Sequence, residues 1–181
     1  MPGYAAFLRG VNLGKARRVG SGELRAIFEG EGFSEVSTFR TSGNVVFAAD
    51  AQPYDALASR IEQGLADELG YEVSVFLRNA KQVREIAGQK PFPRNQVEAS
   101  RGKLQVAMLS SAPKGRARSE VLALATDEDQ LAFGDLELYW LPSGGTRDST
   151  LNARTIEKIL GPTTMRTKAT VELLSAKYFG R

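Results

Sequence analysis

Apolar positions along the first eighty residues alternate between strand-like and helix-like spacing. Tyr4 to Leu8 is an apolar, strand-like run, and Glu72 to Leu77 alternates polar with β-branched and apolar residues, which predicts a second strand. Two helical stripes lie between these strands. They are formed by Leu24, Ile27 and Phe28, and by Leu57, Ile61, Leu65 and Leu69. The spacing therefore predicts two helices between two strands.

A turn cluster, Ser42-Gly43-Asn44, divides the segment between the two helices. Val36 to Arg40 precedes the cluster and Val45 to Phe47 follows it, so the segment predicts a β-hairpin. The resulting order is βαββαβ over residues 3–79. This order predicts a ferredoxin-like unit, in which two helices cover one face of a four-stranded antiparallel sheet.

The second half of the chain repeats the element order of the first, without matching residues. A short helix over Ala80 to Ala87 leads into residues 91–102, whose Pro, Asn and Ser content predicts a connector. A strand, a helix and a hairpin follow at Lys103 to Leu109, Lys114 to Ala125, Gln130 to Phe133 and Leu136 to Leu141. Two helices, around Ile156 and around Val171, close the chain. The predicted fold class is α+β with two subdomains, residues 1–90 and 103–181, the second a βαββα unit with a C-terminal helix.

Two smaller predictions concern polar and aromatic residues of the second half. The acidic run Asp127-Glu128-Asp129 lacks the ligand spacing of a calcium loop and predicts a solvated turn before a strand. Trp140 alternates with Leu136 and Leu138, which predicts a core position. The sequence predicts no metal site.

Composition excludes several kinds of chemistry. The 181 residues contain neither cysteine nor histidine, so disulfides, Ser-His-Asp triads and histidine-containing zinc sites cannot form. The net charge is only +3, which is small for a dedicated nucleic-acid-binding protein. There is no membrane-spanning apolar run and no signal-peptide pattern at the N-terminus. We therefore expect a cytoplasmic protein that does not bind membranes.

The clearest candidate site lies where the first strand ends, in the stretch FLRGVNLGKARR. In a ferredoxin-like sheet the first and third strands are antiparallel neighbours, which predicts that Arg9, Gly10 and Asn12 lie beside Ser42 and Asn44. Lys15 and two arginines follow, so positive charge and the first helix N-terminus favour an anion there. The alternative is structural: the glycines supply positive φ angles and the asparagines cap turns.

Three motifs resemble a bacterial family, the domain-of-unknown-function family sixteen ninety-seven. They are LRGVNLG at residues 8–14, SGNVVF at residues 42–47 and TTMRTKATV at residues 163–171. The resemblance implies a two-subdomain α+β fold and no established activity. Lys15 stands where the family usually has a second glycine. In the third motif Arg166 keeps the family's arginine, whereas Thr167, Lys168 and Ala169 replace its usual Asn, Trp and Asn.

These observations favour binding, or turnover, of a small anionic or phosphate-bearing ligand at the loop edge of the first sheet. The expected ligand-binding residues are Arg9, Gly10, Asn12, Lys15, Ser42 and Asn44, with Arg166 arriving from the other half. The alternatives are a weak nucleic-acid-binding module and a structural or partner-binding protein. The sequence leaves open whether the chain is an enzyme, which cofactor it uses and its oligomeric state.

Overall fold

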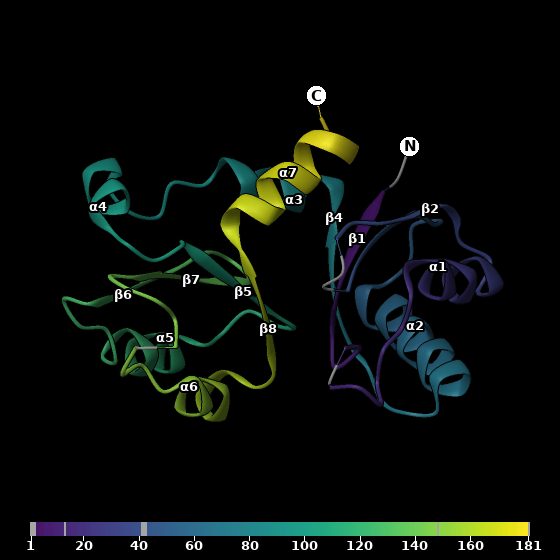
Figure 1. Cartoon of the computed structure of the whole chain (residues 1–181), viewed down its shortest axis with the longest axis horizontal. Coiled ribbons are helices and arrows are strands. Elements are labelled where there is room, and N and C mark those ends of the chain that lie inside the picture. The colour runs from purple at the N-terminus through teal and green to yellow at the C-terminus, as the bar shows by residue number, and fades with distance from the viewer. Residues whose placement is uncertain (1–2, 13, 41–42, 148, 181) are drawn as a thin grey trace. The chain divides into compact units, whose positions relative to one another are not determined.

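The structure is a computed structural model that describes residues 3–12, 14–40, 43–147 and 149–180. The chain divides into two compact units. Unit 1 contains residues 1–84 and 174–181, and unit 2 contains residues 85–173. Each unit has its own four-stranded antiparallel sheet. Figure 1 shows two α+β units, which confirms the predicted fold class.

Unit 1 is the predicted ferredoxin-like unit. Its elements are β1 (Tyr4–Arg9), α1 (Ser21–Gly30), β2 (Ser34–Thr38), β3 (Asn44–Ala48), α2 (Tyr54–Leu69) and β4 (Ser74–Asn79). The strands are arranged in the order β2-β3-β1-β4, so β1 and β3 are antiparallel neighbours. In Figure 1, α1 and α2 lie side by side on one face of this sheet.

The core of unit 1 forms because the predicted apolar stripes face the sheet. Leu57, Ile61 and Leu65 of α2 are buried, and the helix ends at Gly70, which adopts the left-handed φ of 75° typical of a helix C-terminus. From the sheet, Phe47 enters the same cluster and lies among several aromatic rings. Burial of these apolar side chains is the main stabilising term of the unit.

Unit 2 has the same topology, with the strand order β6-β7-β5-β8. Its elements are α4 (Arg94–Ala99), β5 (Gln105–Leu109), α5 (Gly115–Leu122), β6 (Asp129–Phe133), β7 (Glu137–Pro142), α6 (Ala153–Leu160) and β8 (Thr163–Thr167). Two helices, α3 (Ala80–Gly88) and α7 (Lys168–Tyr178), cross the boundaries between the units. Helix α4 lies in the segment predicted as a connector.

Strand β8 is an addition to the predicted order, which had no element between the last two helices. Its buried residues are polar: Thr164 and Arg166 are buried on the face of the sheet opposite the core around Trp140, whereas the apolar Met165 lies on the core side and is 37% exposed. Strand prediction from apolar alternation therefore has nothing to detect here. The strand completes unit 2 as a βαββαβ unit.

The sequence predicted a solvated turn for the acidic run at residues 127–129, but its last residue begins β6 and is buried. Asp129 is buried: its Oδ1 accepts a hydrogen bond from Trp140 Nε1 (2.7 Å) and its Oδ2 accepts one from Ser149 Oγ (2.7 Å). A buried carboxylate needs such donors. Trp140 is buried in the core of unit 2, as predicted.

The fourth strands of the two units carry an arginine at the same position, a correspondence that the sequence did not reveal. Arg78 of β4 and Arg166 of β8 each lie one residue before the end of the strand, opposite the second residue of β1 and β5 respectively. Both side chains are buried, and each donates from Nη1 to the carbonyl of the preceding residue, at 2.7 and 2.8 Å. The sheets therefore hold an arginine at the same place by the same contact.

The preceding helix caps the outer edge of each fourth strand. Val75 N donates to Glu62 Oε1 of α2 (2.9 Å), and Thr163 N donates to Glu157 Oε1 of α6 (3.3 Å), at equivalent strand positions. In unit 1 the hydroxyl of Tyr54 also accepts a hydrogen bond from Leu77 N (2.9 Å). Such caps satisfy backbone donors that an edge strand otherwise presents to another chain.

Candidate functional site

The sheet of unit 1 brings the end of β1 beside the start of β3, as predicted. Phe7 lies opposite Asn44, and Leu8 N donates to Gly43 O (2.7 Å). The segment from Arg9, the last residue of β1, to Asn12 therefore begins beside the tip of the β2–β3 hairpin. Ser42, another predicted ligand-binding residue, lies outside the described residues.

Two glycines at this edge have positive φ angles. Gly10 has a φ of 92° and Gly43 a φ of 73°. A Cβ atom at Gly43 would lie 2.7 Å from Val11 Cγ2 and 3.1 Å from Leu8 Cβ, whereas one at Gly10 would lie 3.6 Å from its nearest neighbour. The hairpin tip therefore packs tightly against the start of the loop, and Gly43 is required both for its backbone conformation and for this close approach.

Three contacts hold the loop between β1 and α1, one within the loop and two with Tyr71. Asn12 Oδ1 accepts a hydrogen bond from Val19 N (3.1 Å), which joins the two ends of the loop. Tyr71, in the connection between α2 and β4, donates its hydroxyl hydrogen to Val11 O (3.1 Å). The guanidinium of Arg17 lies 4.8 Å from the centre of the Tyr71 ring. These contacts give the loop a defined path around its basic residues.

The surroundings of Tyr71 raise the pKa of its hydroxyl above the ordinary value of 10.0. Burial is the main cause, the positive charge of Arg17 lowers the pKa, and the negative charge of Glu23 raises it. The hydroxyl is therefore protonated at neutral pH and is able to donate to the Val11 carbonyl.

The two predicted asparagines both hold loops. Besides the contact of Asn12 with Val19, the Asn44 side chain is buried and donates from Nδ2 to Phe39 O (2.9 Å), across the hairpin turn. The Asn44 contact is the structural alternative that the sequence left open for this residue. Contact of either asparagine with a ligand stays a prediction.

The basic residues of the loop are exposed. Lys15 and Arg18 form no ion pair within the part of the chain that the structure describes, so both charges are available to an anion. Arg9, at the end of β1, is half-buried and lies opposite Ser74 of β4. No side chain caps the first turn of α1, but Glu23 in that turn opposes an anion at the helix N-terminus. The loop cations therefore determine the charge of this edge.

Comparison with known proteins places the chain in a family. The family model described as "Protein of unknown function (DUF1697)" matches residues 1–139. The chain belongs to the DUF1697 family. This match contains the first two motifs of the sequence, at residues 8–14 and 42–47, whereas the third motif at residues 163–171 lies beyond it.

A solved structure has the same fold. The conserved bacterial protein SP0830 from Streptococcus pneumoniae is similar over 98% of this chain and 98% of its own, with a TM-score of 0.72 and 18% sequence identity. No curated protein matches the chain. At this identity the likeness shows the fold alone, so the DUF1697 family and the solved structure leave the function to be inferred from the site.

In this DUF1697 member, Arg166 lies in a strand, whereas the sequence placed it at the start of the last helix. It is 8% exposed, and its Nη1 donates to Thr164 Oγ1 (2.9 Å) and to Met165 O (2.8 Å). Neighbouring Lys168 donates to Ala87 O (2.8 Å) and pairs with Glu172. Arg9 and Arg166 belong to different units, and their action on one ligand stays a prediction.

Burial of Arg166 predicts a stability signal at high pH. Desolvation lowers the pKa of this guanidinium to about 10, so folded and unfolded chains are equally protonated at pH 7. Above about pH 10 the unfolded chain binds more protons, and the free energy of unfolding rises with pH. In urea unfolding, the free energy of unfolding of wild type minus that of Arg166→Met should be flat from about pH 6 to 9 and should rise above about pH 10. A difference that stays constant up to about pH 11 would contradict the lowered pKa.

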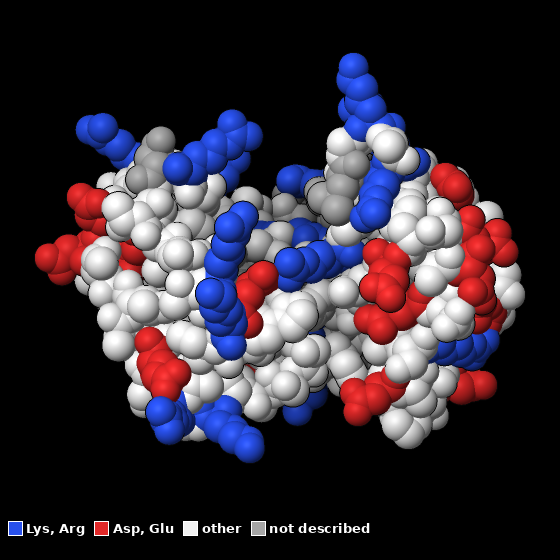
Figure 2. All heavy atoms as spheres, turned by 90° about the horizontal axis from the view of Figure 1, so that it is seen from below, with Lys and Arg blue, Asp and Glu red and all other residues white. Residues whose placement is uncertain are grey.

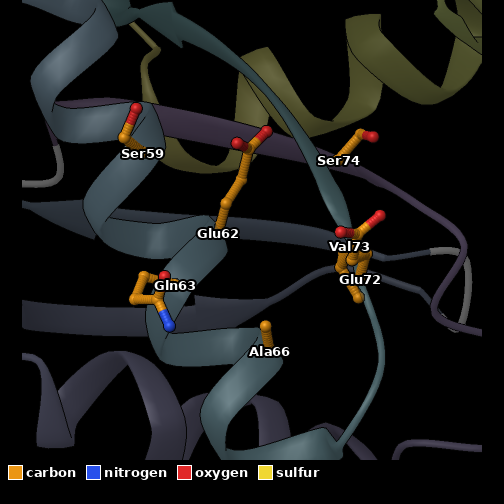
Figure 3. Close-up of a pocket in the computed structure, with 7 residues that line it drawn as sticks. All are labelled: Ser59, Glu62, Gln63, Ala66, Glu72, Val73 and Ser74. Carbon is orange, nitrogen blue, oxygen red and sulfur yellow. The ribbon is translucent and has the colours of Figure 1, made fainter.

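A hollow of about 400 Å³ lies between α2 and β4 in unit 1. Figure 3 shows its lining, in which Glu62 reaches from α2 toward the strand that it caps. The lining residues are Ser59, Glu62, Gln63, Ala66, Glu72, Val73 and Ser74. Two carboxylates and no lysine or arginine line this hollow, so it does not suit an anion. Within the described residues, no group of three or more acidic side chains is placed to hold a metal ion.

The residues that sequence reasoning missed are Tyr71, which attaches the loop and contacts Arg17, and Arg78, the buried counterpart of Arg166. Tyr71 lies 60 residues from the carbonyl that it binds, and its own segment has no distinctive motif. The sequence signal for Arg78 was an arginine within a strand, directly after the apolar residues 75–77.

Proposed function

We propose that this protein binds a small anionic ligand, such as a phosphate ester, at the loop between β1 and α1. The observation that carries the proposal is the pair of exposed cations, Lys15 and Arg18, on a loop attached at both ends. A loop already held in place loses little conformational entropy when it binds. Arg9, Gly10 and the hairpin tip at Gly43 and Asn44 form the adjoining wall in this proposal.

Unit 2 offers an internal comparison that supports this placement. Its corresponding loop, residues 110–114, contains one lysine and no arginine. Its third strand begins with a buried glutamate, Glu137, which lies opposite Met108 as Asn44 lies opposite Phe7. A buried carboxylate at that position repels an anion. Anion binding is therefore proposed for unit 1 alone.

The distribution of surface charge favours a small ligand over nucleic acid. Figure 2 shows both basic and acidic side chains on the visible surface of the protein, whose net charge is only +3. A nucleic-acid-binding surface presents a continuous basic stripe, because affinity grows with the number of phosphates contacted.

Within the described residues, no helix is long and apolar enough to cross a bilayer. A cytoplasmic location stays a prediction.

Pyrophosphate titration tests the proposed function. The double variant Lys15→Gln/Arg18→Gln should bind pyrophosphate about tenfold more weakly than wild type, because two charged contacts of roughly 0.7 kcal/mol each are lost. The affinity should also depend less steeply on salt. Isothermal titration calorimetry at several salt concentrations measures both quantities.

Lys114→Gln is the matched control. This lysine is exposed and is the single basic residue of the corresponding loop in unit 2, so its removal changes the net charge without touching the proposed site. Its affinity should match that of wild type within about twofold. Lys15→Gln and Arg18→Gln are also measured singly, because each changes the net charge by as much as the control does. An equal loss of affinity in Lys114→Gln and in either of these single variants, or no saturable binding by wild type, would rule out the loop as the site.

A further inference from the structure

We infer that Tyr71 is a positioning residue for the anion-binding loop, holding its basic residues in the conformation that receives the ligand. The inference rests on the proposed function, because it assigns a role to a residue outside the loop. Tyr71 follows the end of α2 and is far from the loop in sequence.

The contacts of Tyr71 enclose the part of the loop that carries the site. Its hydroxyl binds the Val11 carbonyl (3.1 Å), near the start of the loop, and its ring contacts the Arg17 guanidinium (4.8 Å), near the end. Lys15 lies between these two points and Arg18 directly after them. The Tyr71 side chain therefore restricts how far Lys15 and Arg18 can move from the edge of the sheet.

The contact with Arg17 also determines which cations are available. A guanidinium over an aromatic face is attracted to the ring and is partly removed from water. Arg17 is therefore occupied by Tyr71, whereas Lys15 and Arg18 have no such contact within the described part of the chain. Arg17 orients the loop, and its two neighbours meet the ligand.

The hydroxyl and the ring of Tyr71 are separable by substitution. Tyr71→Phe keeps the ring under Arg17 and removes the hydrogen bond to Val11. The fraction of molecules with an ordered loop should fall, and the apparent affinity falls with that fraction. We expect about threefold weaker pyrophosphate binding. All loop cations remain, so the salt dependence of binding should keep the wild-type slope, unlike that of Lys15→Gln/Arg18→Gln.

Tyr54→Phe is the matched control for this substitution. Tyr54 also lies in unit 1, and its hydroxyl also makes one hydrogen bond to the backbone, with Leu77 N (2.9 Å). Loss of that bond should lower the stability of unit 1 by a similar amount without loosening the loop. Amide hydrogen exchange over residues 11–19 should accelerate in Tyr71→Phe and stay at the wild-type rate in Tyr54→Phe.

The three chains are compared by pyrophosphate titration and hydrogen exchange. Weaker binding with faster loop exchange in Tyr71→Phe alone supports the inference. Equal affinities of wild type and Tyr71→Phe overturn it and leave the proposed function intact. Equal losses in both tyrosine variants also overturn it, because a loss of general stability then accounts for the effect. If the wild-type chain does not bind pyrophosphate, the proposed function fails and the inference fails with it.

Discussion

Replacing Phe47 with alanine is expected to lower the free energy of unfolding of unit 1 by about 4 kcal/mol. Phe47 is fully buried, and its ring centre lies 5.7 Å from that of Tyr4, 5.3 Å from that of Phe28 and 4.8 Å from that of Phe33. Truncation removes buried apolar surface and leaves a cavity, because the strand and the facing helix are both held by other contacts. It also removes three aromatic pairs.

Urea unfolding followed by circular dichroism measures this loss. Leu122→Ala is the control, because Leu122 is 42% exposed at the end of α5 and its truncation should change stability by less than about 1 kcal/mol. A loss below about 1.5 kcal/mol for Phe47→Ala would show that this ring does not occupy a close-packed core.

The second large effect is expected at the hairpin tip. Gly43→Ala should lower the free energy of unfolding by about 3 kcal/mol, for two separate reasons. The φ of 73° costs a residue with a side chain about 1 kcal/mol. The added methyl group would also lie 2.7 Å from Val11 Cγ2, closer than carbon atoms approach without displacement. The variant should therefore separate the tip from the loop that carries the proposed site.

Gly10→Ala isolates the first of these two costs. Its φ of 92° is strained for alanine, but the nearest atom to the new Cβ, Glu72 O, is at 3.6 Å, an ordinary contact distance. The expected loss is about 1 to 2 kcal/mol. Equal losses at both glycines, measured in the same urea experiment, would refute the close packing of the tip against Val11.

Local patterns in the sequence were sufficient for most of unit 1. The stripe of α2, with Leu57, Ile61 and Leu65 on one face, can bury its apolar surface only as a helix against a sheet. The turn cluster at residues 42–44 could only join two strands, and the adjacency of β1 and β3 follows from the βαββαβ order. The predicted adjacency of β1 and β3 was therefore correct, whereas contact of Gly10 or Asn12 with Ser42 or Asn44 stays a prediction.

Buried polar residues limited the prediction in unit 2. In strand β8, Thr164 and Arg166 are buried and the apolar Met165 is 37% exposed, and Asp129 is buried against Trp140. Each of these polar groups is stable there because of hydrogen bonds to particular partners. Such partners come from distant parts of the chain, so a pattern of hydrophobic and polar positions cannot show them.

The spacing of residues was enough to predict the element order and topology of unit 1 and a basic, glycine-containing loop at the end of its first strand. The three-dimensional structure was needed to show how that loop is held, through the contact of Tyr71 with Val11 and Arg17. It also decided that Arg166 is buried in a strand and matched by Arg78 in the other unit. Secondary structure follows from the spacing of residues that are close in sequence, so a sequence pattern can predict it. The conformation of a loop depends on side chains that are distant in sequence and that only folding brings to it.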